Sequence, residues 1–326
     1  MKIKTLKVAI IGAGRWGMNH VKTACGLIEG KNIYVCDENP AVEEKLKLIS
    51  EEINFTNRYQ DILSNSEINA VIIASPAETH YPITKEMLGV GKHVLVEKPI
   101  TLHLEEAIEL NTIAETNKLK LMVGHVLLYH PAILHIKESI LSGNLGKLQY
   151  IYSNRLNLGA IRSEENILWS FAPHDISIIQ FLIENDPISI IAKGDIFLQN
   201  NIEDTTITYL KYPNNVSAHI FVSWLHPFKE QRLVVIGEKG MFVFEDTVKT
   251  EKLKFYHKGF VVSESGIEKF DQDYEAIDLQ SVMPLAEEQL HFYNSILNDQ
   301  EPRTNGKHAI AVQKILDLAT KSLKSK

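Results

Sequence analysis

Three glycines near the N-terminus constrain the fold of this chain more than any other feature. Gly12, Gly14 and Gly17 follow the apolar run LKVAIIG in G-x-G-x-x-G spacing, and a segment with helical spacing comes next. In this arrangement the first glycine permits a tight turn, the second admits a pyrophosphate close to the backbone, and the third lets helix and strand pack closely. The helix N-terminus attracts the phosphates. The spacing predicts a dinucleotide-binding turn; the alternative is a glycine turn without a ligand.

An acidic residue stands where a ribose-binding carboxylate is expected. Asp37 ends a second apolar run, twenty residues after Gly17, and a carboxylate there accepts hydrogen bonds from the adenosine ribose. The same charge repels the 2′-phosphate of NADP, so we expect NAD as the cofactor. Arg15 and Trp16 lie in the turn, where they either contact the pyrophosphate or pack on the surface.

Strand-like and helix-like segments alternate from residue 6 to residue 123. The strand-like segments are continuous apolar runs, such as NAVIIASP and KHVLVEKP, as is typical of parallel strands that are buried on both faces. Such alternation predicts an α/β domain with a parallel sheet between layers of helices. We therefore expect an N-terminal Rossmann domain over residues 1–123.

Residues 124–326 have a different pattern. From about residue 187 to 265 it is mostly strand-like, with PNN and GEKG where hairpin turns belong, and helices are expected at about 284–298 and 308–323. This pattern predicts a C-terminal α+β domain over 124–326 with an open, mostly antiparallel sheet.

Length, charge and cysteine content restrict the classes of protein that fit. A chain of 326 residues, with 44% hydrophobic and 23% charged residues, is an ordinary globular protein long enough for two domains. The net charge is −7 and the one basic block is the terminal KSLKSK, so we expect no nucleic-acid partner. Two cysteines without CxxC spacing indicate a reducing compartment. The apolar N-terminal run is too short for a signal peptide or a membrane span, so we expect a cytoplasmic protein without a membrane partner.

The residues that follow the apolar strands are candidates for cofactor contacts, because open α/β sheets bind ligands at the carboxyl edge of their strands. His80 begins a helix there, which would also explain it without a ligand. Three histidines at 125, 130 and 135 turn away from one helix face, so we expect no metal site. The cofactor candidates at the strand ends are Ser75, Pro76, His80, Glu97, Lys98 and His125.

Together these motifs resemble the Gfo/Idh/MocA oxidoreductases. The resemblance is carried by GAGRWG, ASPAETH, GKHVLVEKP, the segment at 124–132 and a histidine near 174, and EKP is its most specific element. It implies a Rossmann domain, a second domain whose open sheet often mediates oligomerisation, and hydride transfer between a nicotinamide and a carbohydrate hydroxyl or ketone. Within the family, NRLNLG and NILWSFAPHDIS look most like the nucleotide-sugar 3-dehydrogenases.

The resemblance assigns Lys98 to the catalytic lysine of the EKP element. A lysine at the end of a central strand can reach the nicotinamide edge, where its ammonium would stabilise the alkoxide that forms as a sugar hydroxyl loses its proton. It could also carry that proton. The alternative is a solvated surface lysine. We expect Glu97 to orient Lys98 or the nicotinamide ribose.

The segment NILWSFAPHDISII carries the second candidate catalytic group. Pro173 suits the first position of a helix, which would place His174 and Asp175 in the first turn. The helix dipole there disfavours an imidazolium, and a neutral imidazole can act as a general base. The resemblance places His174 at the catalytic histidine of the family. Asp175 would then be a cap or an orienting group.

One position departs from the family pattern. Many members, including inositol-oxidising ones, have an aspartate four residues before this histidine, where this chain has Ser170. The departure argues against an inositol-type mechanism and fits an enzyme that relies on Lys98 and His174, with Ser170 as a neutral hydrogen-bond partner.

Other polar side chains are candidates for the sugar site, each with an ordinary packing or surface role as the alternative. An arginine could bind a sugar-nucleotide diphosphate through two hydrogen bonds, and a tryptophan could pack on the nicotinamide or the sugar. The segment SWLHPFKEQR, 223–232, either closes the site or ends two strands at an interface. The candidates are Tyr129, Arg155, Asn157, Arg162, Asn166 and Trp169.

The preferred hypothesis is NAD-dependent oxidation of the 3-hydroxyl of a UDP-activated amino sugar, with UDP-N-acetylglucosamine as the first candidate. A sugar aminotransferase would consume the ketone, and the enzyme would be a homodimer or homotetramer. The alternatives are another sugar or cyclitol dehydrogenase, a ketosugar reductase, and a regulatory protein that binds the cofactor without catalysis.

Overall fold

The computed structural model describes residues 2–159 and 161–324. Its internal contacts divide the chain into two compact units. The first unit contains the chain up to Tyr129 together with Val282–Ile310, and the second contains His130–Ser281 together with the chain from Ala311 onward.

The units differ from the expected domains because the chain returns to the first unit near its end. Helix α8 (Pro284–Leu297) packs against α1 (Arg15–Leu27) and η3 (Val126–Tyr129). The sequence pattern shows that α8 exists but does not indicate which sheet or helix its apolar face contacts.

The first unit is a Rossmann fold, as predicted. Its six strands pair in the order β3-β2-β1-β4-β5-β6, and every pair is parallel. All four residues of β1 and of β4 are buried, which accounts for their unbroken apolar sequences. The strands are β1 (Val8–Ile11), β2 (Ile33–Cys36), β3 (Asn54–Thr56), β4 (Ala70–Ile73), β5 (His93–Val96) and β6 (Leu121–Val123).

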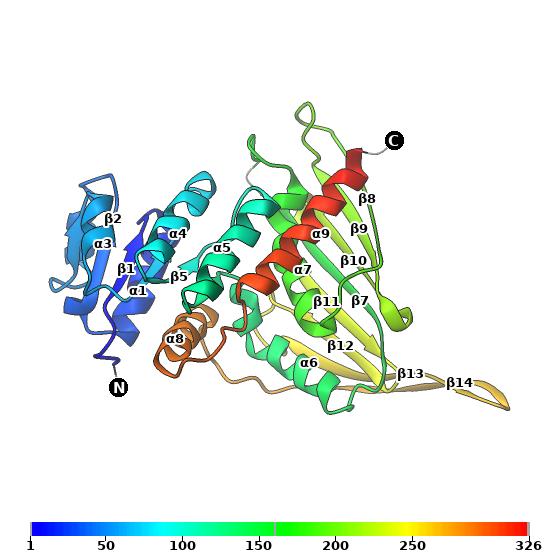
Figure 1. The fold of residues 1–326 in the computed structure, drawn as a ribbon. Helices are drawn as coiled ribbons and strands as arrows, with labels where there is room; N and C mark the ends of the chain where they lie inside the picture. Colours follow the sequence, from blue (N-terminus) through cyan, green and yellow to red (C-terminus); the bar gives the residue numbers. More distant parts are fainter. Residues whose placement is uncertain (1, 160, 325–326) are drawn as a thin grey trace. The chain divides into compact units, whose positions relative to one another are not determined.

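Helices cover the sheet of the first unit on both faces, and Figure 1 shows their places. Helix α1 packs against β1 and β2, and α4 packs against β4 and β5. The further helices of this unit are α2 (Val42–Lys47), α3 (Tyr59–Ser64), α4 (His80–Gly89) and α5 (Leu104–Thr116), with short η1 (Gly30–Asn32) and η2 (Ala77–Thr79).

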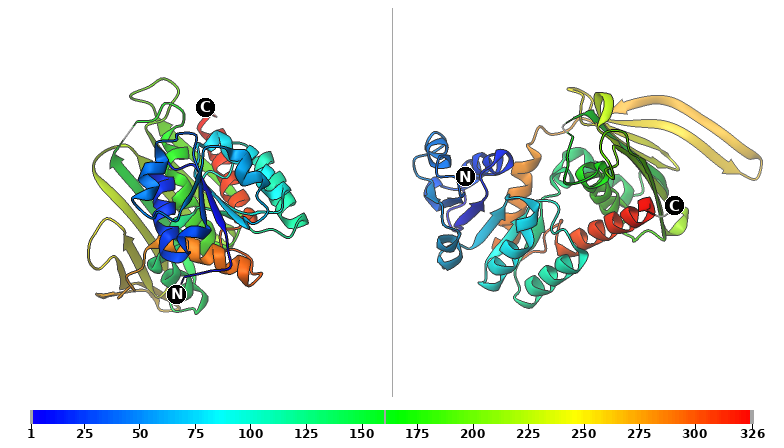
Figure 2. Two further views of the ribbon diagram at one scale, coloured as in Figure 1. Left: turned by 90° about the vertical axis from the view of Figure 1, so that its left-hand side faces the viewer. Right: turned by 90° about the horizontal axis from the view of Figure 1, so that it is seen from above.

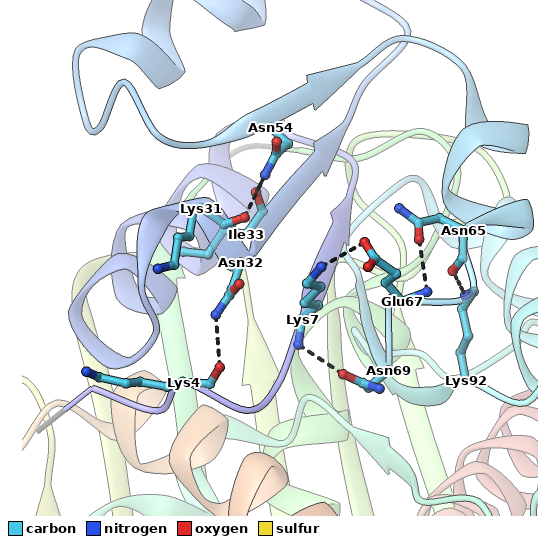
Figure 3. Close-up of polar contacts among 10 residues, drawn as sticks. All are labelled: Lys4, Lys7, Lys31, Asn32, Ile33, Asn54, Asn65, Glu67, Asn69 and Lys92. Atoms are coloured by element: carbon cyan, nitrogen blue, oxygen red, sulfur yellow. Dashed lines mark hydrogen bonds and ion pairs between the residues drawn. The ribbon is translucent and has the colours of Figure 1, made fainter.

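Lysine and asparagine side chains join the segments at the amino edge of this sheet (Figure 3). The Nζ of buried Lys92 donates to the carbonyl oxygens of Asn65 and Ile68 at 2.6 and 3.1 Å. The side chain of Asn69 accepts a hydrogen bond from the Lys7 backbone N–H at 3.1 Å. These bonds hold the starts of the strands, so the opposite, carboxyl edge is left for a ligand.

The second unit contains an eight-stranded sheet in the order β14-β13-β12-β11-β7-β10-β9-β8. Only the β7–β10 pair is parallel, which confirms a mostly antiparallel sheet. The strands are β7 (Leu148–Leu158), β8 (Ser189–Asp195), β9 (Thr205–Lys211), β10 (Ser217–Ser223), β11 (Leu225–Gly237), β12 (Gly240–Glu245), β13 (Leu253–Ser263) and β14 (Gly266–Ala276).

Helices cover one face of this sheet. In Figures 1 and 2, α6 (Pro131–Leu141), α7 (Ile167–Ile183) and the second-unit part of α9 (Gly306–Lys324) lie on the same side of the strands. Alternate residues of β9 show the consequence: Thr206, Thr208 and Leu210 are buried, whereas Ile207 and Tyr209 are exposed on the other face.

Two strands were not predicted. Strand β3 has only three residues, and none of them is fully buried. Strand β14 follows the expected end of the strand region at 265 and exposes almost every residue, so it has no apolar alternation to reveal it. Pairing with β2 and with β13 makes these segments strands, and such pairing is a tertiary property.

Candidate functional site

The glycine turn of the first unit has the geometry that a dinucleotide requires. Gly12 has a φ of +87°, and a Cβ there would lie 2.7 Å from the Ser75 nitrogen. A Cβ on Gly17 would lie 1.9 Å from the Gly12 carbonyl oxygen. A Cβ on Gly14 would meet no atom within 4 Å, so the backbone there is open to a ligand. Each glycine therefore has the role that the spacing predicted.

A cavity of about 270 Å³ adjoins this turn. No side chain caps the N-terminus of α1, and its first turn carries no acidic residue, so its free N–H groups suit a phosphate. The chemistry of this lining fits the adenosine and pyrophosphate part of a dinucleotide. The cavity is lined by Ala13, Gly14, Arg15, Met18, Asp37, Asn39, Val42 and Lys45.

Asp37 lines the same cavity directly after β2. Its Oδ2 accepts a hydrogen bond from the Ala13 N–H at 2.6 Å, and its Oδ1 accepts one from the Asn39 N–H at 2.9 Å. These two bonds fix the carboxylate beside the glycine turn, and each oxygen retains capacity for a further donor. The position matches the expected ribose contact.

His80 joins two loops at the carboxyl edge. Its ring is buried, with Nδ1 2.7 Å from the Pro99 carbonyl oxygen and Nε2 2.9 Å from the Ser75 carbonyl oxygen. Both ring nitrogens are thus engaged by main chain, which places His80 as a support for the loops after β4 and β5. Pro76 lies in the same loop, and the Ser75 hydroxyl is bonded to Thr79 at 2.7 Å.

Glu97 connects the end of β5 to the glycine turn. Its Oε1 accepts a hydrogen bond from the Trp16 indole N–H at 2.5 Å and lies 2.8 Å from His20 Nε2. The Gln289 amide lies 3.0 Å from His20 Nδ1, a pattern that places the proton of His20 on Nε2. The space next to Glu97 depends on Gly124, because a Cβ there would lie 2.9 Å from the carboxylate.

Lys98 lies two residues after the end of β5 and is half-buried. The neighbouring His125 is fully buried, and its pKa is held well below the ordinary value by burial and, secondarily, by the charges of His308 and Lys98. The His125 and His308 rings meet edge to face, 5.5 Å apart. The His125 side chain is therefore neutral. Because it is buried, only the backbone of His125 is available for contact with a ligand.

Tyr129 differs from the expectation of a sugar contact. Its side chain is 2% exposed, its hydroxyl lies 3.2 Å from the Thr304 hydroxyl, and the Arg303 guanidinium stacks over its ring at 4.7 Å. The residues around 303 return to the first unit and cover it, which the local sequence does not reveal.

In the second unit, helix α7 begins earlier than predicted. Asn166 is the N-cap, and its side-chain oxygen accepts a hydrogen bond from the Trp169 N–H at 3.2 Å. Pro173 lies inside the helix rather than at its first position. The prediction that His174 and Asp175 lie in the first turn is therefore wrong, and the argument from the helix dipole does not apply to them. The helix begins after Asn166 because its side chain caps the first turn, and Pro173 does not mark the start.

Asp175 is a buried ion-pair partner and not a cap. Its carboxylate accepts hydrogen bonds from Arg155 Nε at 2.7 Å, from Arg155 Nη2 at 3.1 Å and from Ser153 Oγ at 2.5 Å. Side-chain exposure is 2% for Asp175 and 11% for Arg155. The fork of Arg155 is thus engaged by Asp175, which argues against the expected diphosphate contact.

His174 is half-buried on α7, one turn after Ser170, so the two side chains share one side of the helix. Ser170 is 6% exposed. Asp175, next in the chain, points to β7 and fixes the rotation of the helix about its axis. The ion pair with Arg155 thereby positions His174.

The remaining candidates of the second unit have structural contacts. Trp169 donates from its indole N–H to the Thr320 hydroxyl of α9 at 2.9 Å, and Asn166 donates from its amide to Glu203 at 2.6 Å. Arg162 is exposed and pairs with Glu165 at 3.3 Å. Asn157 is half-buried near the end of β7.

The segment 223–232 is mainly structural. Trp224 is 1% exposed, and its indole N–H donates to Asp204 at 2.5 Å; β11 begins one residue later. The segment therefore contains the end of β10 and the start of β11, and Trp224 joins it to Asp204.

The sequence analysis missed His20 and Gln289, which support Glu97. His20 follows Trp16 by four residues in α1, so a helical wheel could have placed both on one face. No local signal connects either to Gln289, which lies 269 residues further along the chain.

Membrane helices and clustered metal ligands are both absent from the described residues. In the parts 2–159 and 161–324, no helix is both long and apolar enough to cross a membrane. Over the same ranges, no three or more histidine, cysteine or acidic side chains are grouped as a metal site would need.

The six parallel strands, the glycine turn and the carboxylate after β2 define a dinucleotide-binding Rossmann protein. Residues 6–125 match the oxidoreductase family with an NAD-binding Rossmann fold, and residues 133–243 match the GFO/IDH/MocA C-terminal domain. The chain belongs to the Gfo/Idh/MocA oxidoreductase family.

Similar proteins span the whole chain or most of it. An uncharacterised oxidoreductase of Synechocystis is 26% identical over 364 residues, which cover 100% of this chain and 96% of the relative. Inositol 2-dehydrogenase of Rhizobium meliloti is 26% identical over 254 residues, 74% of this chain and 76% of that protein. The structure of UDP-N-acetylglucosamine 3-dehydrogenase from Acidithiobacillus ferrooxidans has a TM-score of 0.82 with 23% identity and covers 98% of each chain. That last likeness supports the fold alone.

Proposed function

We propose that this protein is an NAD-dependent dehydrogenase that oxidises the 3-hydroxyl of a UDP-activated amino sugar, with UDP-N-acetylglucosamine as the first candidate. The observation that carries the dehydrogenase proposal is the position of Lys98, two residues after β5 at the same sheet edge as the glycine turn. An inositol 2-dehydrogenase among the similar proteins supports a polyhydroxylated ring as the class of substrate.

Asp37 supports NAD as the cofactor. Its carboxylate faces the cavity beside the glycine turn, where it would bind both ribose hydroxyls and repel a 2′-phosphate. The backbone of the glycine turn would hold the pyrophosphate, and the loops at Ser75 and Glu97 would hold the nicotinamide part. The bound nicotinamide supplies the hydride acceptor.

In the proposed reaction, Lys98 and His174 share the handling of the hydroxyl proton. The half-buried His174 takes the proton as a general base. The Lys98 ammonium stabilises the developing alkoxide while the hydride leaves the sugar carbon. Ser170, one helical turn before His174, supplies a neutral hydrogen-bond partner where inositol-oxidising relatives have an aspartate.

The test is a substrate panel read by NADH fluorescence. We expect a signal with UDP-N-acetylglucosamine or its uronic acid, increased by an aminotransferase that removes the ketone. A signal with inositols or free sugars instead would favour the cyclitol or sugar alternative, and oxidation of NADH by a ketosugar would favour the reductase. Absence of turnover with every UDP-amino sugar, coupled or not, would reject the proposal.

Substitutions separate catalysis from a regulatory role. Lys98→Ala and His174→Ala should each abolish turnover, whereas the exposed Lys22→Ala and His103→Ala serve as matched controls. Turnover unchanged in both site variants would exclude the proposed roles. If the biological role also persisted in them, the regulatory alternative would be favoured.

We also propose a homodimer or homotetramer that forms through the uncovered face of the eight-stranded sheet. Ile191, Ile207 and Tyr209 are exposed on the strands β8 and β9, which suits a face that is buried in an assembly. Light scattering should give a mass that is a multiple of 36.9 kDa, and Ile207→Glu should lower it.

A further inference from the structure

Helix α8 carries a buried acid to which the proposed reaction gives no role. Glu288 is 0% exposed, and among the described residues neither of its carboxylate oxygens has a hydrogen-bond partner. A charged carboxylate that is buried without a hydrogen-bond donor is costly in free energy. The burial of Glu288 therefore favours its neutral, protonated form.

The neighbours of Glu288 place it behind the cofactor site. The next residue, Gln289, bonds to His20, and His20 contacts the Glu97 carboxylate. Burial and, secondarily, the charge of Glu97 raise the pKa of Glu288, and Glu288 contributes to the raised pKa of Tyr129. All of these groups belong to the first unit.

Two close carboxyl groups in a dry environment do not both ionise readily. Two N–H donors, from Trp16 and His20, converge on Glu97 Oε1. Among the described residues Glu288 has no such donor, and it is fully buried. Burial without a donor therefore favours a proton on Glu288.

The other titratable groups around Glu288 do not replace this proton. Burial raises the pKa of Tyr129, so its phenol stays neutral. Burial and the nearby Arg303 lower the pKa of His291, on the same helix, to about 4. Arg303 stacks on Tyr129 and places a positive charge beside that ring.

We infer that Glu288 holds a proton that it releases to solvent when the oxidised nicotinamide binds beside Glu97 and regains from solvent when the ring is reduced. The inference rests on the proposed NAD function. A dinucleotide binds along the carboxyl edge of a Rossmann sheet, and Glu97 follows β5 at that edge. Oxidised nicotinamide carries a positive charge that hydride transfer removes. The charge favours an ionised pair, and its removal favours the return of one proton from solvent.

The first experiment counts protons. Calorimetric titration with NAD⁺ and with NADH, each in two buffers of different ionisation enthalpy, should show release of up to one proton with NAD⁺ only. The difference in proton release between NAD⁺ and NADH binding should disappear in Glu288→Gln. It should persist in Glu287→Gln, the adjacent control on the same helix. Equal release for the two nucleotides, or an unchanged difference in Glu288→Gln, would overturn the inference. Binding of neither nucleotide would instead overturn the proposed function, and the linkage with it.

The second experiment needs no cofactor. Burial and the charge of Glu97 raise the pKa of Glu288 well above 4.5. The folded protein then holds this proton more tightly than the unfolded chain does. The contribution of the proton to the free energy of unfolding is fully present below pH 4.5 and is lost as the pH rises toward the folded-state pKa. Relative to Glu288→Gln, the wild type should lose up to about tenfold in its folding equilibrium constant per pH unit. Glu288→Met provides the same comparison if the glutamine variant does not fold. Parallel pH profiles of wild type and variant would refute a protonated Glu288.

Discussion

Removing the carboxylate of Asp175 should destabilise the second unit strongly. The substitution Asp175→Leu deletes three hydrogen bonds, from Ser153 at 2.5 Å and from Arg155 at 2.7 and 3.1 Å. It leaves the Arg155 guanidinium, 11% exposed, without its counter-ion.

The magnitude follows from this burial. Breaking one partner of a buried pair costs about 3–5 kcal/mol, mostly because the remaining charge is unpaired. For domains of roughly 150–250 residues each kcal/mol lowers the Tm by about 2–4 °C, so we expect a decrease of roughly 6–20 °C. The double variant Arg155→Met/Asp175→Leu removes both charges and should recover most of the loss.

Denaturant unfolding can follow this unit by tryptophan fluorescence, since Trp169 and Trp224 lie in it and Trp16 in the other. We expect a positive coupling energy of about 2–3 kcal/mol in the double-mutant cycle. The reasoning is refuted if Asp175→Leu costs less than about 1 kcal/mol, or if the double variant loses the sum of the two single losses.

Three further perturbations test the first unit. Asp37→Ser should raise the Kd for NAD⁺ about 10- to 150-fold, because the ribose loses hydrogen bonds to a charged acceptor. It should lower the Kd for NADP⁺, because the repelling carboxylate is gone and Lys45 lines the same cavity. Calorimetric titration with both nucleotides checks this. Lys92→Met should cost about 1–3 kcal/mol in urea unfolding, because the Asn65 carbonyl loses its buried donor, and an unchanged midpoint would contradict Figure 3. Burial lowers the pKa of His308 from 6.5 to about 4, so the unfolded chain binds more protons between these values and stability should fall as the pH falls from 6.5 toward 4. His308→Gln should reduce that acid loss by about 2 kcal/mol, measured as the difference in unfolding free energy between pH 7 and pH 5.

Local chemistry made the cofactor half of the site predictable. The turn requires glycine where φ is positive or where backbone segments approach closely, and Asp37 follows the next strand. The roles of these residues therefore depend on a short segment of the sequence. The candidate site in the second unit was predicted less well. Pro173 is a frequent first residue of helices, yet α7 begins at Ile167 because Asn166 caps it and the apolar residues between them are buried.

Sequence by itself determined the class of each sheet and the family, because hydrophobic periodicity and turn residues act between near neighbours; strands β3 and β14 depended on pairing with β2 and β13. Tertiary structure alone decided the roles of Asp175, Tyr129 and Glu288, since each depends on a partner far away in the chain. The partner of Asp175 is 20 residues distant and that of Tyr129 is 175 residues distant. The sequence does not show whether a carboxylate contacts water, an arginine or another acid. Only the packed fold determines which of these contacts it makes.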